Sequence, residues 1–536
     1  MNRNTKNNTR NLIEHTRNMK YILAFEGIIV GIIAGSLAII YRLAMAYSEI
    51  TLEYILAFGS THIWAMAAWF GVLTLMGLVV GFLLKWEPMI SGSGIPQVEG
   101  ELQGCFKASW HRVIIGKLVG GIICMFGGLS LGREGPSVQL GAMGGKGFSR
   151  IFKRINIEER YLITCGASAG LAAAFNAPLA GTIFALEEIH KNFSATILFS
   201  AMTASITADF VSKYVFGLSP VFHFTVTGFI PLKDYWLVIL LGVLLGFAGV
   251  FYNTVLLKSQ VIYGKFRGLK PEFRPVVPFI LAGVLGFTLP QVLGGGNTMI
   301  QLLGSGKLVL SGMLVLLAVK FIFSMVSFGS GAPGGIFFPL LVLGAYIGGI
   351  YGTAASAYLG IDPVLINNFV IIAMAGYFTA IVRAPITSIV LITEMTGSFD
   401  HLLALSVVAI AAELTAGMLN GKPIYDCLLN RILANRNDEP VIDSIDKILI
   451  STKVRQNAMI HNQSIADIDW PDSCLLVSII RQGKEIIPKG NTVIYAHDTI
   501  VALTDEKDTI MINEVLREMC EEHEYEFDLK LSQSRL

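Results

Sequence analysis

Charged side chains are scarce in this chain, and their scarcity excludes most soluble folds. Of its 536 residues, only 15% are Asp, Glu, Lys or Arg, and the formal net charge is +1. With 53% hydrophobic residues and a mean hydropathy of +0.62, the chain is too apolar for a soluble protein of this length. The lack of a basic excess also argues against nucleic acid as a partner. The composition therefore predicts a protein embedded in membrane lipid.

Cysteine and histidine are also sparse, with six and nine residues respectively. The cysteines show neither metal-ligand spacing nor the pattern of a secreted disulfide framework, and no two histidines form an HxxxH pair. We therefore expect no metal site and no bound cofactor. No set of nucleophile and base accompanies the membrane carboxylates either, so an intramembrane hydrolase ranks low and the chain is expected not to be an enzyme.

Apolar runs follow one another from residue 21 to residue 420. Several, such as 63–85 and 235–257, reach the ~20 residues that a spanning helix needs. Others are broken by Gly and Pro, which a membrane tolerates when protein buries the break. Residues 1–20 form a basic tail that should stay in the cytoplasm with the C-terminus, and the run after it is too long for a cleaved signal. We expect a multi-pass protein of the plasma or bacterial inner membrane.

Three interruptions of the apolar part share one design. They are Gly92-Ser93-Gly94-Ile95-Pro96, Gly132-Arg133-Glu134-Gly135-Pro136 and Gly335-Ile336-Phe337-Phe338-Pro339. Each is typical of a broken helix inside a membrane. Broken helices present free backbone N–H groups, which form anion sites.

The membrane part also repeats itself at a nearly constant spacing. Gly92-Ser93-Gly94 matches Gly294-Gly295-Gly296, and the pattern that starts at Gly132 recurs from Gly335. Ala177-Pro178 with Glu187 matches Ala384-Pro385 with Glu394. The repeat predicts two homologous halves, about 21–225 and 230–425, of inverted topology with the substrate site between them. The alternative is that membrane helices rich in Gly and Pro resemble each other anyway.

The composition changes after Tyr425. Residues 431–447 are charged and have the signature of a linker, so residues 21–430 form the membrane domain. A small α+β domain is expected over 448–536, ending in an acidic helical tail from about 505 to 525. Its strand candidates are 474–480, 485–487, 492–495 and 499–503, with a hairpin turn at 481–484.

A dehydrated halide needs partial positive charges, because a full positive partner would hold it too tightly. A helix N-terminus offers roughly half a charge together with free N–H donors. Ser93 can add a hydroxyl, Ile336 and Phe337 backbone N–H groups, and Tyr425 a phenol. These residues are the candidate ligands.

Glu134 can compete with that anion, since its carboxylate would lie at a helix N-terminus. Protonation would neutralise Glu134 and release it, which couples proton and anion thermodynamically. The alternatives are a helix cap or a salt bridge with Arg133, and we expect the latter to be weak because sequence neighbours seldom face each other on a helix.

Glu187 and Glu188 end another apolar run and point about 100° apart on a helix. One can face the interior while the other meets a helix end, although the residues alone favour two interfacial carboxylates at the cytoplasmic boundary. The match of Glu394 to Glu187 predicts a shared structural role. Lys117, Lys320 and Arg383 are expected to be partners of other groups rather than ligands.

These motifs together resemble the CLC family of chloride channels and proton-coupled chloride transporters. The segment 92–96 is similar to the family motif GSGIP, and the segment 132–136 is similar to GREGP. The segment 335–339 is similar to GxFxP, and Tyr425 lies in a GKPxY stretch. The resemblance implies an all-α polytopic fold of two inverted repeats with broken helices. It implies a homodimer that binds chloride at Ser93, Gly94, Ile336, Phe337 and Tyr425.

The resemblance also assigns Glu134 as the external gate and Glu188 as the internal proton-transfer residue. Because channel members commonly lack a carboxylate at the second position, it favours a Cl⁻/H⁺ antiporter over a passive channel gated by voltage or pH. Ser93 fits chloride rather than nitrate. Gln97 replaces a glutamate found in many members, and no functional change is read from it.

The C-terminal region is similar to a TrkA-C domain rather than to paired CBS modules. The similarity rests on 481–498, where Ile486-Ile487-Pro488-Lys489-Gly490-Asn491-Thr492 is close to IPxGxT. Such domains dimerise and bind small ligands, so a nucleotide-type regulator is implied; a dimerisation domain without ligand is the alternative. A potassium-transport component is disfavoured because the chain has no TVGYG-type filter.

Overall fold

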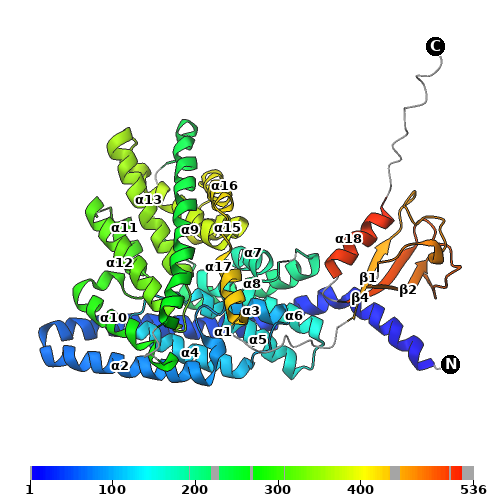
Figure 1. Ribbon diagram of the computed structural model, residues 1–536, viewed down its shortest axis with the longest axis horizontal. Coiled ribbons are helices and arrows are strands. Elements are labelled where there is room, and N and C mark those ends of the chain that lie inside the picture. Colours follow the sequence, from blue (N-terminus) through cyan, green and yellow to red (C-terminus); the bar gives the residue numbers. More distant parts are fainter. Residues whose placement is uncertain are drawn as a thin grey trace, which may run out of the picture. The chain divides into compact units, whose positions relative to one another are not determined.

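The computed structural model describes residues 3–521 except 192, 219–221, 223–227, 266–269, 307, 435–446, 472 and 506–508 (Figure 1). The side chains of 3–19, 447, 448, 505, 509 and 510 are also outside the description. The basic side chains expected before residue 18, most of the expected linker and the acidic end after residue 521 therefore lie outside the described residues. The chain forms two compact units, Met1–Asp438 and Glu439–Leu536.

The first unit is helical, and its two halves carry the same succession of helices. The first half contains α1 (Arg3–Thr61), α2 (Ile63–Trp86), α3 (Ile95–Leu102), α4 (Trp110–Phe126), α5 (Glu134–Ile151), α6 (Asn156–Phe175), α7 (Pro178–Phe184) and α8 (Ala195–Phe216). The second contains α9 (Tyr235–Lys265), α10 (Val276–Thr288), α11 (Asn297–Gly304), α12 (Leu310–Gly329), α13 (Phe337–Leu359), α14 (Ile366–Val382), α15 (Pro385–Thr396) and α16 (Leu402–Met418). A last helix, α17 (Ile424–Ala434), follows them. Within the described residues, seven helices are long and apolar enough to cross a membrane.

Close helix packing explains why glycines recur at matching positions in the two halves. A Cβ atom on Gly141 or Gly145 of α5 would overlap the backbone of α6 at Gly166 or Leu162. On α13, a Cβ on Gly348 would overlap the Phe369 carbonyl of α14, and one on Gly344 would lie 3.0 Å from the Ala373 carbonyl. The two helix pairs α5–α6 and α13–α14 are among the most closely packed in the unit. Glycine is therefore required at these positions in both halves.

Glu187 and Glu394 join the halves by capping each other's short helices. The Glu187 carboxylate accepts hydrogen bonds from the backbone N–H groups of Ile386 (3.2 Å) and Thr387 (2.8 Å), at the start of α15. The Glu394 carboxylate accepts them from Leu179 (3.1 Å) and Ala180 (2.8 Å), at the start of α7. The first N–H groups of a helix have no intrahelical partner, so each carboxylate satisfies donors that would otherwise be orphaned in lipid. The sequence predicted a shared structural role for Glu187 and Glu394, and capping each other's helices is such a role.

The second unit is an antiparallel sheet in the order β1-β4-β2-β3 with α18 (Thr509–Cys520) packed against β1 and β4. Its strands are β1 (Lys447–Lys453), β2 (Cys474–Arg481), β3 (Lys484–Ile486) and β4 (Thr499–Asp505). Gln482 and Gly483 both have positive φ, at 49° and 77°, which suits the tight turn of the β2–β3 hairpin. The fold class, a polytopic helical domain followed by a small α+β domain, is confirmed.

Two details of this sheet differ from the sequence expectation. Residues 492–495 do not form a strand, because Val493 makes only an isolated bridge with Ser464 before the chain turns at Tyr495–Asp498. The edge strand β1, which lies where the linker was expected to end, was not predicted. Its seven residues KILISTK begin directly after a charged stretch that masked the change from linker to strand.

Candidate anion and proton site

The three interrupted segments of the membrane unit meet at the starts of α3, α5 and α13. A Cβ atom on Gly335 would lie 3.1 Å from the backbone nitrogen of Gly135, so the loops before α5 and α13 touch. Between these loops the N–H of Gly132 donates to the carbonyl of Gly335 (2.6 Å), and the N–H of Gly335 donates back to Gly132 (2.8 Å). The residues matched by the repeat are thus paired across the junction of the two halves.

Glycine is required where the α3 loop approaches α5. Gly94 caps the start of α3 with a φ of 95°, a conformation that favours glycine, and a Cβ there would overlap the Gln139 side chain. A Cβ on Gly135 would overlap the Ser93 hydroxyl. Ser93 consequently lies directly against the first turn of α5, beside Glu134.

Two buried lysines hold the loops that lead into the site. Lys117 Nζ donates to the carbonyl oxygens of Ile90 (2.9 Å) and Gly92 (2.6 Å). Lys320 Nζ makes the matching bonds in the second half, to Val292 (2.9 Å) and Gly294 (2.7 Å). Both side chains are wholly buried. Their bonding to backbone carbonyls agrees with the expectation that they act as partners of other groups.

Buried polar atoms without a hydrogen bond gather at this junction. The Ser93 and Tyr425 hydroxyl oxygens and both carboxylate oxygens of Glu134 have no hydrogen-bond partner among the described residues. Ser93 is 2% exposed, and Tyr425 and Glu134 are 0% exposed. Buried polar side chains are nearly always hydrogen-bonded, so such a concentration of exceptions calls for a ligand or a functional reason.

The Glu134 carboxylate lies at the N-terminus of α5 and faces that of α13. The backbone N–H groups of Glu134, Phe338 and Arg133 are directed at it, without reaching full hydrogen-bond geometry. Arg133 Nε lies 3.6 Å from Glu134 Oε1, an ion-pair contact that is longer than a hydrogen bond. Arg133 is the N-cap of α5 rather than a residue within the helix, so the helical rule against neighbouring contacts does not apply to it.

Tyr425 approaches the same place from α17. Its hydroxyl is within interaction distance of Ser93 and within electrostatic reach of Glu188 and Glu134. The ring of Phe184 lies between those of Phe337 and Tyr425, with centroid distances of 5.9 and 6.5 Å. The structure therefore brings Ser93, Glu134, Phe337 and Tyr425 together, with Gly94 and Ile336 as the N-cap residues of α3 and α13.

Two polar side chains hold the loop that leads into α17, the helix that carries Tyr425. Asn253 Nδ2 on α9 donates to the carbonyl oxygens of Ile381 (3.1 Å) and Lys422 (3.2 Å). Arg383 Nη1 donates to Gly421 (3.2 Å) while its Nε bonds Glu413 (2.9 Å). Sequence analysis missed Asn253, although a lone amide inside the apolar run 235–257 is a signal that could have found it.

Glu188 lies on a one-turn π-helix, Ala185–Ile189, that continues α7. On this turn Glu187 caps α15, whereas Glu188 is 4% exposed and its Oε1 has no hydrogen-bond partner among the described residues. Its charged neighbours are Lys191, Glu99 and Asp426. Burial opposes the charge of Lys191, yet its hydrogen bonds to Asp426 and Glu99 outweigh that effect and raise the pKa of Lys191 above its usual value. Lys191 therefore stays charged beside Glu188 at neutral pH.

A cavity of about 1230 Å³ leads to Ser93 from one side of the membrane unit. Its lining includes more basic than acidic side chains. The basic ones are Lys85, Lys107, Lys265, Arg274 and Arg431, and the acidic ones are Glu87 and Glu272. A mouth with this charge raises the local concentration of anions.

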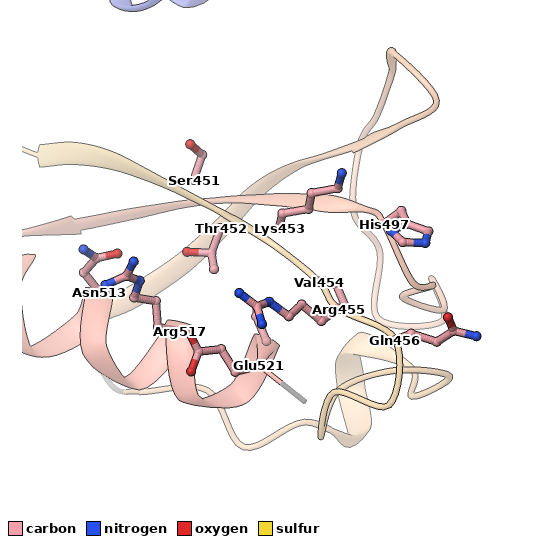
Figure 2. A pocket seen from close by; sticks show the side chains of 11 residues that line it. Ser451, Thr452, Lys453, Val454, Arg455, Gln456, His497, Asn513, Arg517 and Glu521 are labelled. Atoms are coloured by element: carbon pink, nitrogen blue, oxygen red, sulfur yellow. The ribbon is translucent and has the colours of Figure 1, made fainter. Parts of the chain in front are cut away.

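The C-terminal unit has a pocket of its own, of about 820 Å³, between β1 and α18. Figure 2 shows Arg455 reaching toward α18, which carries Asn513 and Arg517 and is followed directly by Glu521. Lys453 and His497 also line it. Three cationic side chains and one carboxylate give this pocket a positive balance.

Helices interrupted at the junction of two repeated halves, with unpartnered donors around a buried carboxylate, define a membrane transport protein for a small anion. Residues 76–417 match the voltage gated chloride channel family, and the chain belongs to that family. Residues 449–517 match the TrkA-C domain.

The chain is similar to curated relatives along most of their length. It is 32% identical over 445 residues to the H(+)/Cl(-) exchange transporter ClcA of Yersinia pestis, covering 80% of this chain and 93% of the relative. It is 32% identical over 443 residues to ClcA of Salmonella arizonae, covering 80% and 92%. A solved structure of a slow cyanobacterial Cl⁻/H⁺ antiporter superposes with a TM-score of 0.74 at 29% identity, covering 78% of this chain and 99% of that one.

Proposed function

We propose that this protein exchanges chloride for protons across the membrane. The observation that carries the proposal is the cluster of buried oxygens of Ser93, Tyr425 and Glu134 that lack a hydrogen bond within the described residues, at the starts of three broken helices. Relatives named as exchange transporters and the resemblance to a Cl⁻/H⁺ antiporter structure support it. A passive chloride channel of the same fold is the second candidate, since both classes occur in the family that the motifs resemble.

Chloride would be held by partial charges only. The N-terminal ends of α3, α5 and α13, with Gly94, Ile336 and Phe337 at two of them, contribute backbone dipoles, and Ser93 and Tyr425 contribute hydroxyl donors. Glu134 would occupy the outer part of this site when charged and leave it when protonated. Glu188 would supply or remove the proton from the side of the Ser93 cavity.

The test uses purified protein in liposomes with separate chloride and pH gradients. An imposed chloride gradient should drive protons uphill, and the reversal potential should depend on both ions. A reversal potential that follows chloride alone and ignores the pH gradient would select the channel instead.

Removal of either hydroxyl from the site should weaken chloride binding. We expect Ser93→Ala and Tyr425→Phe each to raise the Kd for chloride by about 2- to 10-fold, the effect of losing one hydrogen bond of about 0.5–1.5 kcal/mol. Titration calorimetry of the detergent-solubilised protein measures this. Tyr346→Phe is the matched control, because the Tyr346 hydroxyl bonds the Met299 carbonyl (3.0 Å) away from the site. Equal Kd values in all four proteins would remove these hydroxyls from the site.

The remaining proposals concern the membrane location, the topology and the oligomeric state of the protein. We place the protein in the plasma or bacterial inner membrane as a homodimer, with its termini in the cytoplasm, as the basic N-terminal tail and the family resemblance imply. Each subunit would carry its own pathway.

The TrkA-C domain is proposed to bind a nucleotide-type regulator in the pocket between β1 and α18. Lys453, Arg455 and Arg517 suit a phosphate, because Arg and Lys make charge-assisted hydrogen bonds to it. Full-length protein titrated with ATP and with a cyclic purine dinucleotide should bind one of them, and Arg517→Gln should weaken binding about tenfold or more, since a hydrogen bond to a charged group contributes about 1.5–3 kcal/mol. Lys484→Gln, an exposed cation of β3 outside the pocket, is the control. No binding of either nucleotide would favour a domain that only dimerises.

A further inference from the structure

A second membrane carboxylate, Glu49 on α1, lies beside Glu134. Glu49 and Glu134 line one small cavity, of about 10 Å³, together with Arg133, Asn297 and Phe338. This cavity shares no lining residue with the large cavity that reaches Ser93. Glu49 therefore belongs to an approach to Glu134 that is separate from the Ser93 cavity.

The groups around Glu49 come from four different elements. Arg133 before α5 and Lys320 on α12 are the cations that act on it, the Asn297 side chain at the start of α11 is directed at it, and Glu53 is the like charge one turn along α1. Glu49 Oε1 also lies close to Gly294, whose carbonyl binds Lys320. The Glu49 side chain is thus held in place beside the loops that shape the site.

The size of the small cavity matters for proton movement. A volume of about 10 Å³ is enough for roughly one water molecule, and its lining offers the polar partners that such a water needs. Glu134 is wholly buried, whereas Glu49 is partly exposed. A proton that travels between Glu134 and the outer solution would therefore pass Glu49 on its way.

We propose that Glu49 relays protons between the outer solution and Glu134 through a single water. This inference rests on the proposed exchange function. The Glu49 carboxylic acid gives its proton to the water while the water gives one of its own to the Glu134 carboxylate, so that one O–H bond breaks and one forms at each transfer. Solution then reprotonates Glu49. Arg133, which faces both carboxylates, reduces the repulsion between them when both are charged.

The test compares Glu49→Gln in two backgrounds. With Glu134 intact, Glu49→Gln should slow coupled chloride and proton fluxes by about tenfold or more, a typical loss for a positioned proton-transfer group, at an unchanged ion ratio. With Glu134→Ala, where chloride no longer waits for protonation of residue 134, the same change should leave chloride flux unaltered. Glu49→Asp should retain most of the rate, and Asp209→Asn, a buried carboxylate of α8 that pairs with Lys213 (2.8 Å), should retain all of it.

Each outcome decides between the proposals. Equal slowing in both backgrounds would mean that Glu49 acts on chloride or on folding, and no slowing in either would mean that protons take another route; both results overturn the relay. A wild-type protein that moves chloride without protons would instead overturn the exchange function, and the relay with it.

Discussion

Replacement of Glu188 by glutamine is expected to stop proton transport while chloride still crosses the membrane. Glutamine keeps the size and polarity of the side chain but cannot exchange a proton at neutral pH. In liposomes loaded with chloride, proton uptake measured by a pH electrode should fall by about tenfold or more, the scale of losing a proton-transfer group. Chloride efflux measured in the same sample should stay within a few-fold of wild type.

The local structure explains why the loss should be selective. The π-helical turn directs Glu188 toward the interior, within electrostatic reach of Tyr425, and away from the α15 cap made by Glu187. Its other neighbours, Glu99 and Asp426, share Lys191, whose side chain is partly exposed. Glu188 is therefore close both to Tyr425 of the proposed chloride site and to a charged cluster that reaches solution, and it is not one of the proposed chloride ligands.

Glu187→Gln is the matched control for this experiment. It removes a carboxylate one residue away but should leave coupling intact, because Glu187 only caps α15. Its expected cost is about 1 kcal/mol of stability, seen as a lower melting temperature in detergent. Proton transport that persists in Glu188→Gln, or that disappears in a folded Glu187→Gln protein, would remove Glu188 from the proton route.

The internal repeat made much of this architecture predictable from sequence. Matched residues turned out to make matched contacts: Gly132 pairs with Gly335, Lys117 and Lys320 bind equivalent carbonyls, and Glu187 and Glu394 cap each other's helices. Such pairs are visible in sequence because each half must satisfy the same backbone groups in lipid, where water cannot do so. The starts of α5 and α13 were predictable for the same reason.

Other features depend on packing between segments that sequence spacing does not reveal. Arg133 contacts Glu134 from the N-cap position before the helix, and Glu187 and Glu188 lie on a π-helical turn that no residue pattern predicted. Glu49 gave no signal, since α1 has several polar residues and only the fold brings this one to Glu134. In the sheet, a local turn at Asp498 prevented the strand expected over 492–495.

Glu134→Gln should have the largest effect of any single change in the membrane unit. It resembles a permanently protonated gate, so chloride flux should continue, lose its dependence on the pH of the outer solution, and no longer move protons. The reason is that a neutral amide cannot compete electrostatically for the N-terminal dipoles of α5 and α13, at which the charged carboxylate is directed. Chloride efflux measured over a range of outer pH, with proton uptake recorded in parallel, checks both expectations.

Asp209→Asn provides the comparison, because Asp209 is a buried carboxylate of α8 that pairs with Lys213 (2.8 Å) away from the site. It should keep the pH dependence and the coupling of wild type. A Glu134→Gln protein that still responds to outer pH would mean that another group is the gate.

The two glutamate variants also distinguish a shared proton route from independent ones. If protons pass from Glu188 to Glu134, the double variant should behave as Glu134→Gln does alone. The reason is that Glu188 then has no carboxylate at position 134 to which it can transfer a proton. Rates that fall further in the double variant would show that Glu188 contributes to chloride movement itself.

In a passive channel, by contrast, Glu188→Gln would change neither chloride flux nor its response to outer pH, while Glu134→Gln would still abolish that response. The pattern of the three variants therefore separates exchanger from channel by a criterion independent of the gradient experiment.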